Sequence, residues 1–369
     1  MAIREKYPVF INGKFEEPQN GQYCASVSPM SQQTVTQIAN GDHQDVDLAV
    51  QAAVVAAPTW KQVKPAQRAK LLFAIAQELR EKAAELAEIE SAETGKPAFQ
   101  TPFEVEGAAA YFEFYAGLVN LPAGEVINMG ADYHCYSLRE PFGVVGVITP
   151  WNAPVFTCGW QIAPAICAGN GVLLKPSELT PLSSTVVAKL IEEAGIPKGL
   201  VNVINGLGQT TGAAAIGNPV TKKVVFVGSP RTGGVIATAA AQRVIPCVLE
   251  LGGKSANIVF NDADIDRAVV GAQAAVFAAA GQSCVSGSRL LVQRSVYDQV
   301  VERVASACSK LPVGLPWSEQ TMIGPINNAA QFSHVRGLVA DGIAEGAEVA
   351  AGGQKPQIDG GEEGYFYQP

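Results

Sequence analysis

Short apolar runs rich in valine, isoleucine and leucine recur through the middle of this chain, with helical segments between them. The runs cover residues 143–148, 171–175, 200–204 and 223–227, and each leads into a turn that contains proline or glycine. Such runs, alternating with helices, are typical of a parallel sheet covered by helices on both faces. The sequence therefore predicts an α/β fold, in which ligands bind at the carboxyl ends of the strands.

Other segments have apolar residues at the spacing of a helix. From Ala66 apolar residues recur at helical intervals, which predicts one long helix ending near Gly95, where glycine favours a left-handed cap and the proline that follows prevents continuation. Two more helices are predicted over residues 102–119 and 183–194, the second with a serine cap at its start. Residues 1–60 are predicted to form short apolar runs and turns.

Composition limits the class of protein. With 48% hydrophobic and 16% charged residues among 369, the chain is not of the disordered type, and its length predicts two or three domains. The net charge of −8 and the lack of any Lys/Arg-rich run exclude nucleic acid as an expected partner. No stretch is long and apolar enough to predict a signal peptide or a membrane span, so no membrane partner is expected.

Cysteine and histidine usage indicates the compartment and the chemistry. Seven cysteines are scattered without a C-x-x-C pair, which is typical of reduced thiols and predicts a cytoplasmic protein. The three histidines lie far apart without metal-ligand spacing, so no metal site is expected.

Several strand ends carry residues suited to a nucleotide. Glycines at 206–208 and 228–233 would let backbone N–H groups approach a pyrophosphate, although either segment is more often an ordinary tight turn. Lys175 and Glu178 follow a strand directly. The carboxylate there suits ribose hydroxyls, and the alternative is a solvated ion pair at the rim of the sheet.

Two residues suit covalent catalysis. Cys284 follows a Gly-Gln turn after an alanine-rich helical stretch, where local N–H dipoles would favour a thiolate; the alternative is a structural thiol. Glu250 lies among apolar residues and glycines. Burial there would disfavour its charged form and suit a general base, whereas pairing with Lys254 or capping a turn is the structural alternative.

Five segments in order resemble the aldehyde dehydrogenase superfamily, and the resemblance covers the whole chain. They are Thr149-Pro-Trp-Asn-Ala-Pro154, Lys175-Pro-Ser-Glu178, Phe226-Val-Gly-Ser229 with Gly233, Glu250-Leu-Gly-Gly-Lys254 and Gly281-Gln-Ser-Cys284. The resemblance implies oxidation of a small-molecule aldehyde to a carboxylic acid. Cys284 would attack the aldehyde, Asn152 and the Cys284 backbone N–H would hold the oxyanion, hydride would pass to NAD(P)⁺, and Glu250 would activate water to hydrolyse the thioester.

The resemblance also implies the cofactor site. NAD is favoured by the carboxylate of Glu178, which would repel a 2′-phosphate, and NADP stays possible. The implied cofactor-binding residues are Thr149, Pro150, Trp151, Lys175, Ser177, Glu178, Gly208, Phe226, Gly228, Ser229, Gly233 and Leu251.

The implied architecture has three parts. Residues 1–118 and 142–253 would form a Rossmann-like NAD(P)-binding domain, residues 119–141 a small β arm for a homodimer or homotetramer, and residues 254–369 the first part of an α/β catalytic domain. Family members normally continue beyond the segment that resembles residues 364–369, so a C-terminally truncated, poorly soluble chain is expected.

Some features leave alternatives open. Gln161 stands where many members have a lysine, and Trp160 would line an apolar entrance or belong to the core. The presence of Glu250 favours hydrolysis over transfer to coenzyme A. A non-catalytic nucleotide-binding or subunit-interaction protein is the alternative outside enzymes.

Overall fold

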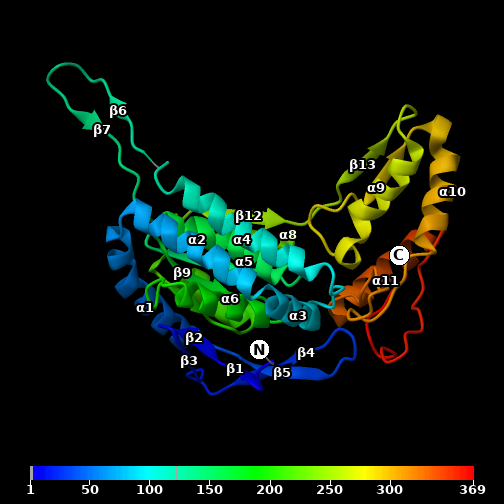
Figure 1. Ribbon diagram of the computed structural model, residues 1–369, viewed down its shortest axis with the longest axis horizontal. Helices are drawn as coiled ribbons and strands as arrows, with labels where there is room; N and C mark the ends of the chain where they lie inside the picture. Colours follow the sequence, from blue (N-terminus) through cyan, green and yellow to red (C-terminus); the bar gives the residue numbers. More distant parts are fainter. Residues whose placement is uncertain (1–2, 122) are drawn as a thin grey trace. The chain divides into compact units, whose positions relative to one another are not determined.

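The computed structural model describes residues 3–121 and 123–369, which form two compact units (Figure 1). Unit 1 contains the described residues up to Ala25 together with Thr36–Leu86 and Phe103–Glu250, and unit 2 contains Ser26–Val35, Ala87–Pro102 and Leu251–Pro369. Both units are therefore discontinuous in sequence.

A seven-stranded sheet organises unit 1, with the strand order β12-β11-β8-β9-β10-β2-β3. The four central strands β11, β8, β9 and β10 are parallel, and β2 joins β10 antiparallel. The predicted parallel α/β sheet is therefore confirmed. The strands are β2 (Val9–Ile11), β3 (Lys14–Glu16), β8 (Val144–Ile148), β9 (Gly171–Lys175), β10 (Val201–Val203), β11 (Thr221–Gly228) and β12 (Cys247–Leu251).

Helices cover this sheet on both faces. Helix α1 (His43–Gln62) packs Val46 and Val50 against Leu173 of β9. It lies so close that a Cβ on Gly171 would be 3.0 Å from the Ala53 side chain. Side chains alternate along a strand, so the neighbours of Leu173 face the other way, where α5 (Pro154–Cys167) and α6 (Leu182–Glu193) contact β8, β9 and β10.

The N-terminal helices differ from the prediction in two ways. Helix α1 was missed, because its buried stripe consists largely of alanine and valine and the helix contains Pro58. The single long helix is wrong: α2 (Pro65–Glu81) ends at Lys82 and α3 (Ala83–Thr94) begins there. The end of α3 before Gly95, which has φ +81°, is as predicted.

Other helices agree more closely. Helix α4 (Thr101–Leu118) confirms the second predicted helix. The third is confirmed as α6, but the serine cap is wrong, since Pro181 is the N-cap and Ser183 is buried inside the helix. The remaining helices of unit 1 are α7 (Ala213–Gly217) and α8 (Pro230–Gln242).

Two small sheets are separate from the central sheet. One has the order β1-β5-β4, from β1 (Lys6–Tyr7), β5 (Thr34–Ala39) and β4 (Tyr23–Val27). The other is the hairpin of β6 (Val126–Ile127) and β7 (Cys135–Tyr136), which extends away from the helices of unit 1 (Figure 1).

Unit 2 contains a parallel pair, β13 (Ala256–Val259) and β14 (Arg289–Val292), with α9 (Ile265–Phe277) packed on β13 and on α10 (Tyr297–Cys308). Helix α11 (Ala329–Ala344) follows, and the chain then runs to Pro369 without further helices or strands. Within the described residues, no helix meets the length and hydropathy needed to cross a membrane.

Candidate active site

Neighbouring strands of unit 1 bring predicted residues to one edge of the sheet. Ile148 at the end of β8 pairs with Lys175 at the end of β9, and the Thr149 N–H donates to the Lys175 carbonyl at 3.2 Å. The Thr180 hydroxyl donates to the Trp151 carbonyl at 3.0 Å, which joins the two turns. Sequence reasoning did not single out Thr180, although its place in the turn after Lys175 was a usable signal.

Lys175 and Glu178 form an ion pair at this edge, with 2.8 Å between Nζ and Oε2. The lysine side chain is only 4% exposed, whereas the glutamate side chain is 36% exposed. The pair is therefore not a solvated rim pair in the ordinary sense. Its buried cation orients a carboxylate that stays accessible to a ligand.

The end of β11 supplies a helix N-terminus. Ser229 caps α8, its Oγ accepting the Thr232 N–H at 3.2 Å. Gly228 is the last residue of β11 and directly precedes this cap, and a Cβ there would be 2.4 Å from the Phe226 ring. Helix N-termini with free N–H groups and tight glycine approaches favour anions such as a pyrophosphate.

Gly208 lies in different surroundings. It is exposed and begins a π-type turn, Gly208–Gly212, and nothing lies within 4 Å of the position that its Cβ would take. Packing therefore does not require glycine at 208.

The Thr149 side chain bears on whether a nucleotide fits at this edge. The Thr149 hydroxyl is buried and has no hydrogen-bond partner among the described residues. A buried hydroxyl without a partner is costly unless something else satisfies it. Together with the α8 N-terminus and the exposed Glu178 carboxylate, it fits a nucleotide at this edge.

Asn152 lies on the turn that leads from β8 into α5, next to Pro150 and Trp151, and is half-buried. In α5 the half-buried Trp160 ring lies 6.5 Å from the Phe156 ring, so it belongs to an aromatic contact in unit 1. Gln161 is buried, and neither amide atom has a hydrogen-bond partner among the described residues.

Glu250 corrects a prediction. The residue is exposed rather than buried, because β12 is the edge strand of the central sheet and leaves one side uncovered. The alternative pairing with Lys254 is not what that lysine does, since its Nζ donates to the Gly253 carbonyl. Leu251, next in the strand, is half-buried.

Cys284 belongs to unit 2, whereas Asn152 and Glu250 belong to unit 1. The thiol is exposed and lies in a turn a few residues beyond the end of α9. Of the other cysteines, Cys158, Cys167 and Cys308 are buried. Exposure and a turn position suit a nucleophile that must reach a substrate.

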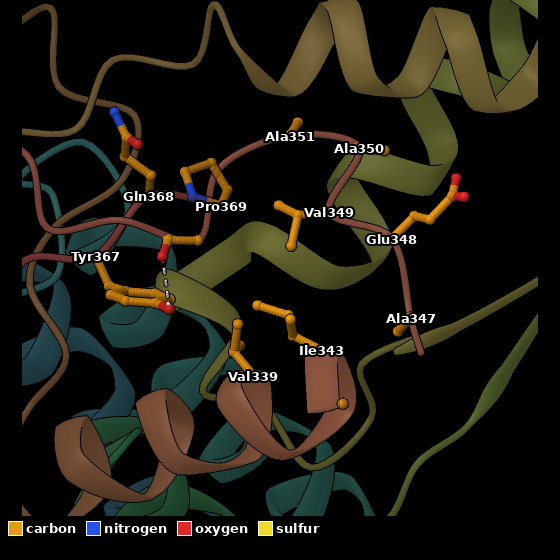
Figure 2. A pocket seen from close by; sticks show the side chains of 12 residues that line it. Val339, Ile343, Ala347, Glu348, Val349, Ala350, Ala351, Tyr367, Gln368 and Pro369 are labelled. Atoms are coloured by element: carbon orange, nitrogen blue, oxygen red, sulfur yellow. Dashed lines mark hydrogen bonds between the residues drawn. The ribbon is translucent and has the colours of Figure 1, made fainter. Parts of the chain in front are cut away.

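A separate pocket in unit 2 lies between α11 and the C-terminal segment, with a volume of about 390 Å³ (Figure 2). Its walls are mostly apolar, and the Tyr367 hydroxyl donates to the Gly353 carbonyl at 2.9 Å. None of the predicted catalytic or cofactor residues lines it. The lining residues are Val339, Gly342, Ile343, Ala347, Glu348, Val349, Ala350, Ala351, Gly353, Tyr367, Gln368 and Pro369.

Over residues 3–121 and 123–369, no group of three or more His, Cys, Asp or Glu side chains is arranged to hold a metal ion.

Comparison with known proteins decides the family. The profile of the aldehyde dehydrogenase family matches residues 15–369. The chain belongs to this family. Betaine aldehyde dehydrogenase of Bacillus subtilis is 38% identical over 364 residues, which cover 98% of this chain and 74% of that protein. Human retinal dehydrogenase 2 is 37% identical over 98% of this chain and 70% of its own length.

Solved structures agree. PnpE from Pseudomonas sp. WBC-3, crystallised with nicotinamide adenine dinucleotide, matches with a TM-score of 0.96 and 38% identity over 99% of this chain and 75% of PnpE. The predicted class is confirmed: the chain is an NAD-dependent aldehyde dehydrogenase with the α/β fold of that family.

Proposed function

We propose that this aldehyde dehydrogenase oxidises its substrate through a covalent intermediate on Cys284, with Asn152 as oxyanion donor and Glu250 as general base. The observation that carries the proposal is the exposed Cys284 thiol on a turn beyond α9, in contrast to the buried Cys158, Cys167 and Cys308.

Each residue has a defined task. The Cys284 sulfur attacks the aldehyde carbon, and the oxygen of the resulting thiohemiacetal is held by the Asn152 amide and the Cys284 N–H. After oxidation, Glu250 takes a proton from water, which attacks the thioester carbon and releases the acid and the thiolate. Removal of one oxyanion donor typically costs ~2.7–4 kcal/mol of barrier.

The edge formed by β8, β9 and β11 would hold NAD, which when bound accepts the hydride lost by the substrate. Glu178, oriented by Lys175, would bind ribose hydroxyls, and the N–H groups at Ser229 would face the pyrophosphate. Thr149 offers its unpartnered hydroxyl. We infer a preference for NAD over NADP, because the Glu178 carboxylate would repel a 2′-phosphate.

Domain roles follow the same reasoning. We assign cofactor binding to residues 1–118 and 142–253, and the nucleophile to the catalytic part over residues 254–369. The seven free cysteines, none of them paired in a disulfide, support a reducing compartment such as the cytoplasm.

The hairpin of β6 and β7 supports a homo-oligomer, dimer or tetramer. Apolar side chains in and next to the hairpin are exposed, with Val126 of β6 at 82% and Leu138, two residues beyond β7, at 73%. A two-stranded hairpin is marginal by itself in water, so a second chain is the natural cover for it. Residues 119–141 would then be the oligomerisation arm.

The decisive experiment compares the chain with its Cys284→Ala variant. Formation of reduced NAD should be followed with betaine aldehyde and with retinal, the substrates named for the two relatives. We expect Cys284→Ala to lose at least about a thousandfold in kcat while its NAD affinity, measured by calorimetry, stays unchanged. Cys135→Ala, in the hairpin, is the matched control and should keep full turnover.

The outcomes separate the alternatives. Turnover that survives in Cys284→Ala contradicts the proposed nucleophile. NAD binding without turnover in the unchanged chain would favour the non-catalytic nucleotide-binding protein. With coenzyme A present, accumulation of free acid supports hydrolysis through Glu250, whereas acyl-coenzyme A would reject it.

A further inference from the structure

The backbone just before Cys284 is strained. Ala279 (φ 50°, ψ 38°) and Ala280 (φ 55°, ψ 36°) are both left-handed, and Gly281 (φ 75°) continues the same conformation. A left-handed residue with a Cβ is unfavourable, and alanine lacks the polar side chain with which asparagine or aspartate compensates locally. Two adjacent alanines in this region persist only when the surroundings hold them there.

Gln282 is the first of these restraints. Its Nε2 donates to the Ala279 carbonyl at 3.0 Å, and its Oε1 accepts the Asn327 N–H at 2.9 Å. The Gln282 N–H also donates to the Ala279 carbonyl, at 3.1 Å. One side chain therefore closes the turn and ties it to the segment before α11.

The other restraints come from residues distant in sequence, all within unit 2. The Ala279 N–H donates to Oε1 of Gln100 at 3.3 Å. Asn327 is only 5% exposed, and its Nδ2 donates to the carbonyls of Glu93 at 3.1 Å and Thr94 at 3.4 Å. The partner of Gln282 is thus fixed to the end of α3.

We propose that Gln282, Asn327 and Gln100 are positioning residues that hold the strained Ala279–Gly281 turn and thereby fix the direction of the Cys284 thiol. The inference rests on the proposed role of Cys284 as nucleophile. We call these three side chains the clamp. Without the clamp, the turn relaxes toward right-handed or extended conformations, and the thiol loses its fixed orientation.

Hydrogen exchange followed by mass spectrometry tests the clamp without any need for turnover. In Gln282→Ala, exchange in peptides covering 277–284 should accelerate about tenfold. A factor of ten corresponds to about 1.4 kcal/mol, which is the order of the strain in one left-handed alanine. Adding Ala280→Gly to that variant should slow exchange again by about fivefold, because glycine adopts φ of +55° without strain.

The matched control is Ala278→Gly. Ala278 lies in the same segment but has φ of −53°, so glycine there relieves nothing and should accelerate exchange. If Ala280→Gly behaves like Ala278→Gly, the strain is absent and the inference is overturned.

The positioning role is then read from kinetics. Gln282→Ala should lower kcat for aldehyde oxidation about tenfold while leaving KM for NAD unchanged, and Ala280→Gly should restore most of the loss. If exchange responds but kcat does not, the clamp exists without a positioning role and the inference fails. If Cys284→Ala abolishes turnover while Gln282→Ala keeps it, the nucleophile stands and only this inference falls.

Discussion

The seven cysteines differ in exposure. Burial raises the pKa of the Cys167 thiol and of the Cys308 thiol, and at Cys24 burial raises the pKa more than the nearby Lys175 lowers it. A raised pKa means less thiolate at a given pH, so these three thiols should react slowly below about pH 9. We expect iodoacetamide at pH 7.5, roughly physiological, to modify Cys284 at least about tenfold faster than the other three.

Peptide mass spectrometry of the labelled chain would measure this order. Labelling in urea should remove the difference in modification rate, because the buried thiols then become accessible. Equal rates for Cys284 and Cys167 in the folded chain would contradict the exposure found here.

A buried ion pair gives a second prediction at the scale of residues. The Nζ of Lys96 lies 2.7 Å from Oε1 of Glu90, and the two side chains are 3% and 0% exposed. Removal of one partner from such a pair leaves a buried charge without its counterpart and costs ~3–5 kcal/mol. Lys96→Met should therefore lower the denaturation midpoint strongly, and Glu90→Gln combined with Lys96→Met should recover part of the loss.

Denaturant unfolding of Lys96→Met, of Glu90→Gln and of the double variant measures these free energies. A double variant as unstable as the sum of both single variants would show that the two side chains do not interact.

Residue types and order were predicted more reliably than residue environments. Lys175 and Glu178 do lie at a strand end, and Cys284 does follow a turn beyond a helix. The exposure of Glu250 was missed, since apolar neighbours in sequence do not reveal that β12 is an edge strand. Asn327 had no local signal at all, because its partners at 93, 94 and 282 are far away in the chain.

Close helix packing explains one glycine among the elements of unit 1. A Cβ on Gly159 of α5 would lie 2.6 Å from the Cα of Ala108 in α4. Gly159→Ala should force the helices apart and destabilise the chain by ~1–3 kcal/mol. A Cβ on Gly117, which lies in α4, would have no atom within 4 Å. Gly117→Ala should therefore stabilise the chain by ~0.5–1 kcal/mol.

Thermal melts of both variants check the contrast. A Gly159→Ala variant that melts at the wild-type temperature would mean that α4 and α5 have room to adjust.

We expect the ion pairs between α2 and α4 to stabilise the chain in a pH-dependent way. Arg80 bonds Glu106 at 2.7 Å and also Glu113, and these hydrogen bonds lower the pKa of both carboxyl groups. A lowered folded-state pKa contributes stability above the unfolded value of about 4.3, and this contribution is lost as pH falls. Arg80→Ala should cost ~1 kcal/mol at pH 7, since the groups are partly exposed, and almost nothing near pH 3.

Urea unfolding at both pH values would show the difference. Lys70→Ala removes a positive charge from the same helix and is the control. A deficit in Arg80→Ala that persists unchanged at pH 3 would rule out this electrostatic origin.

The elements were predicted unevenly for physical reasons. Buried parallel strands are continuous apolar runs, so β8, β9, β10 and β11 stood out. The break at Lys82 has neither glycine nor proline to signal it, and the buried stripe of α1 consists largely of alanine and valine, which gives only a weak helical pattern. Tertiary packing, rather than local propensity, decides both.

The whole molecule should associate through its hairpin. Val126→Asp places a charge on an apolar projection that we propose is covered by a second chain. We expect the variant to shift from oligomer to monomer in light scattering after size exclusion. Val55→Asp, at a position 76% exposed on α1, is the control and should leave the oligomer intact.

A monomer in both the unchanged chain and the variant would remove the role proposed for residues 119–141. At this scale the family and the parallel sheet could be predicted, because motifs and strand runs survive in local sequence. Ser26–Val35 and Ala87–Pro102 join unit 2 through contacts between residues distant in sequence, which no local pattern records.

Strands β2 and β3 of the central sheet are synthesised long before β10, the strand with which β2 pairs. The Asn12 N–H donates to the Asn202 side chain, 190 residues later, and Phe10 pairs with Val203. At about 5–20 residues per second, the ribosome makes the partner strand roughly 10–40 s after β2 and β3 emerge. During that interval the newborn hairpin has an unpaired strand edge, along which a strand of another nascent chain could pair.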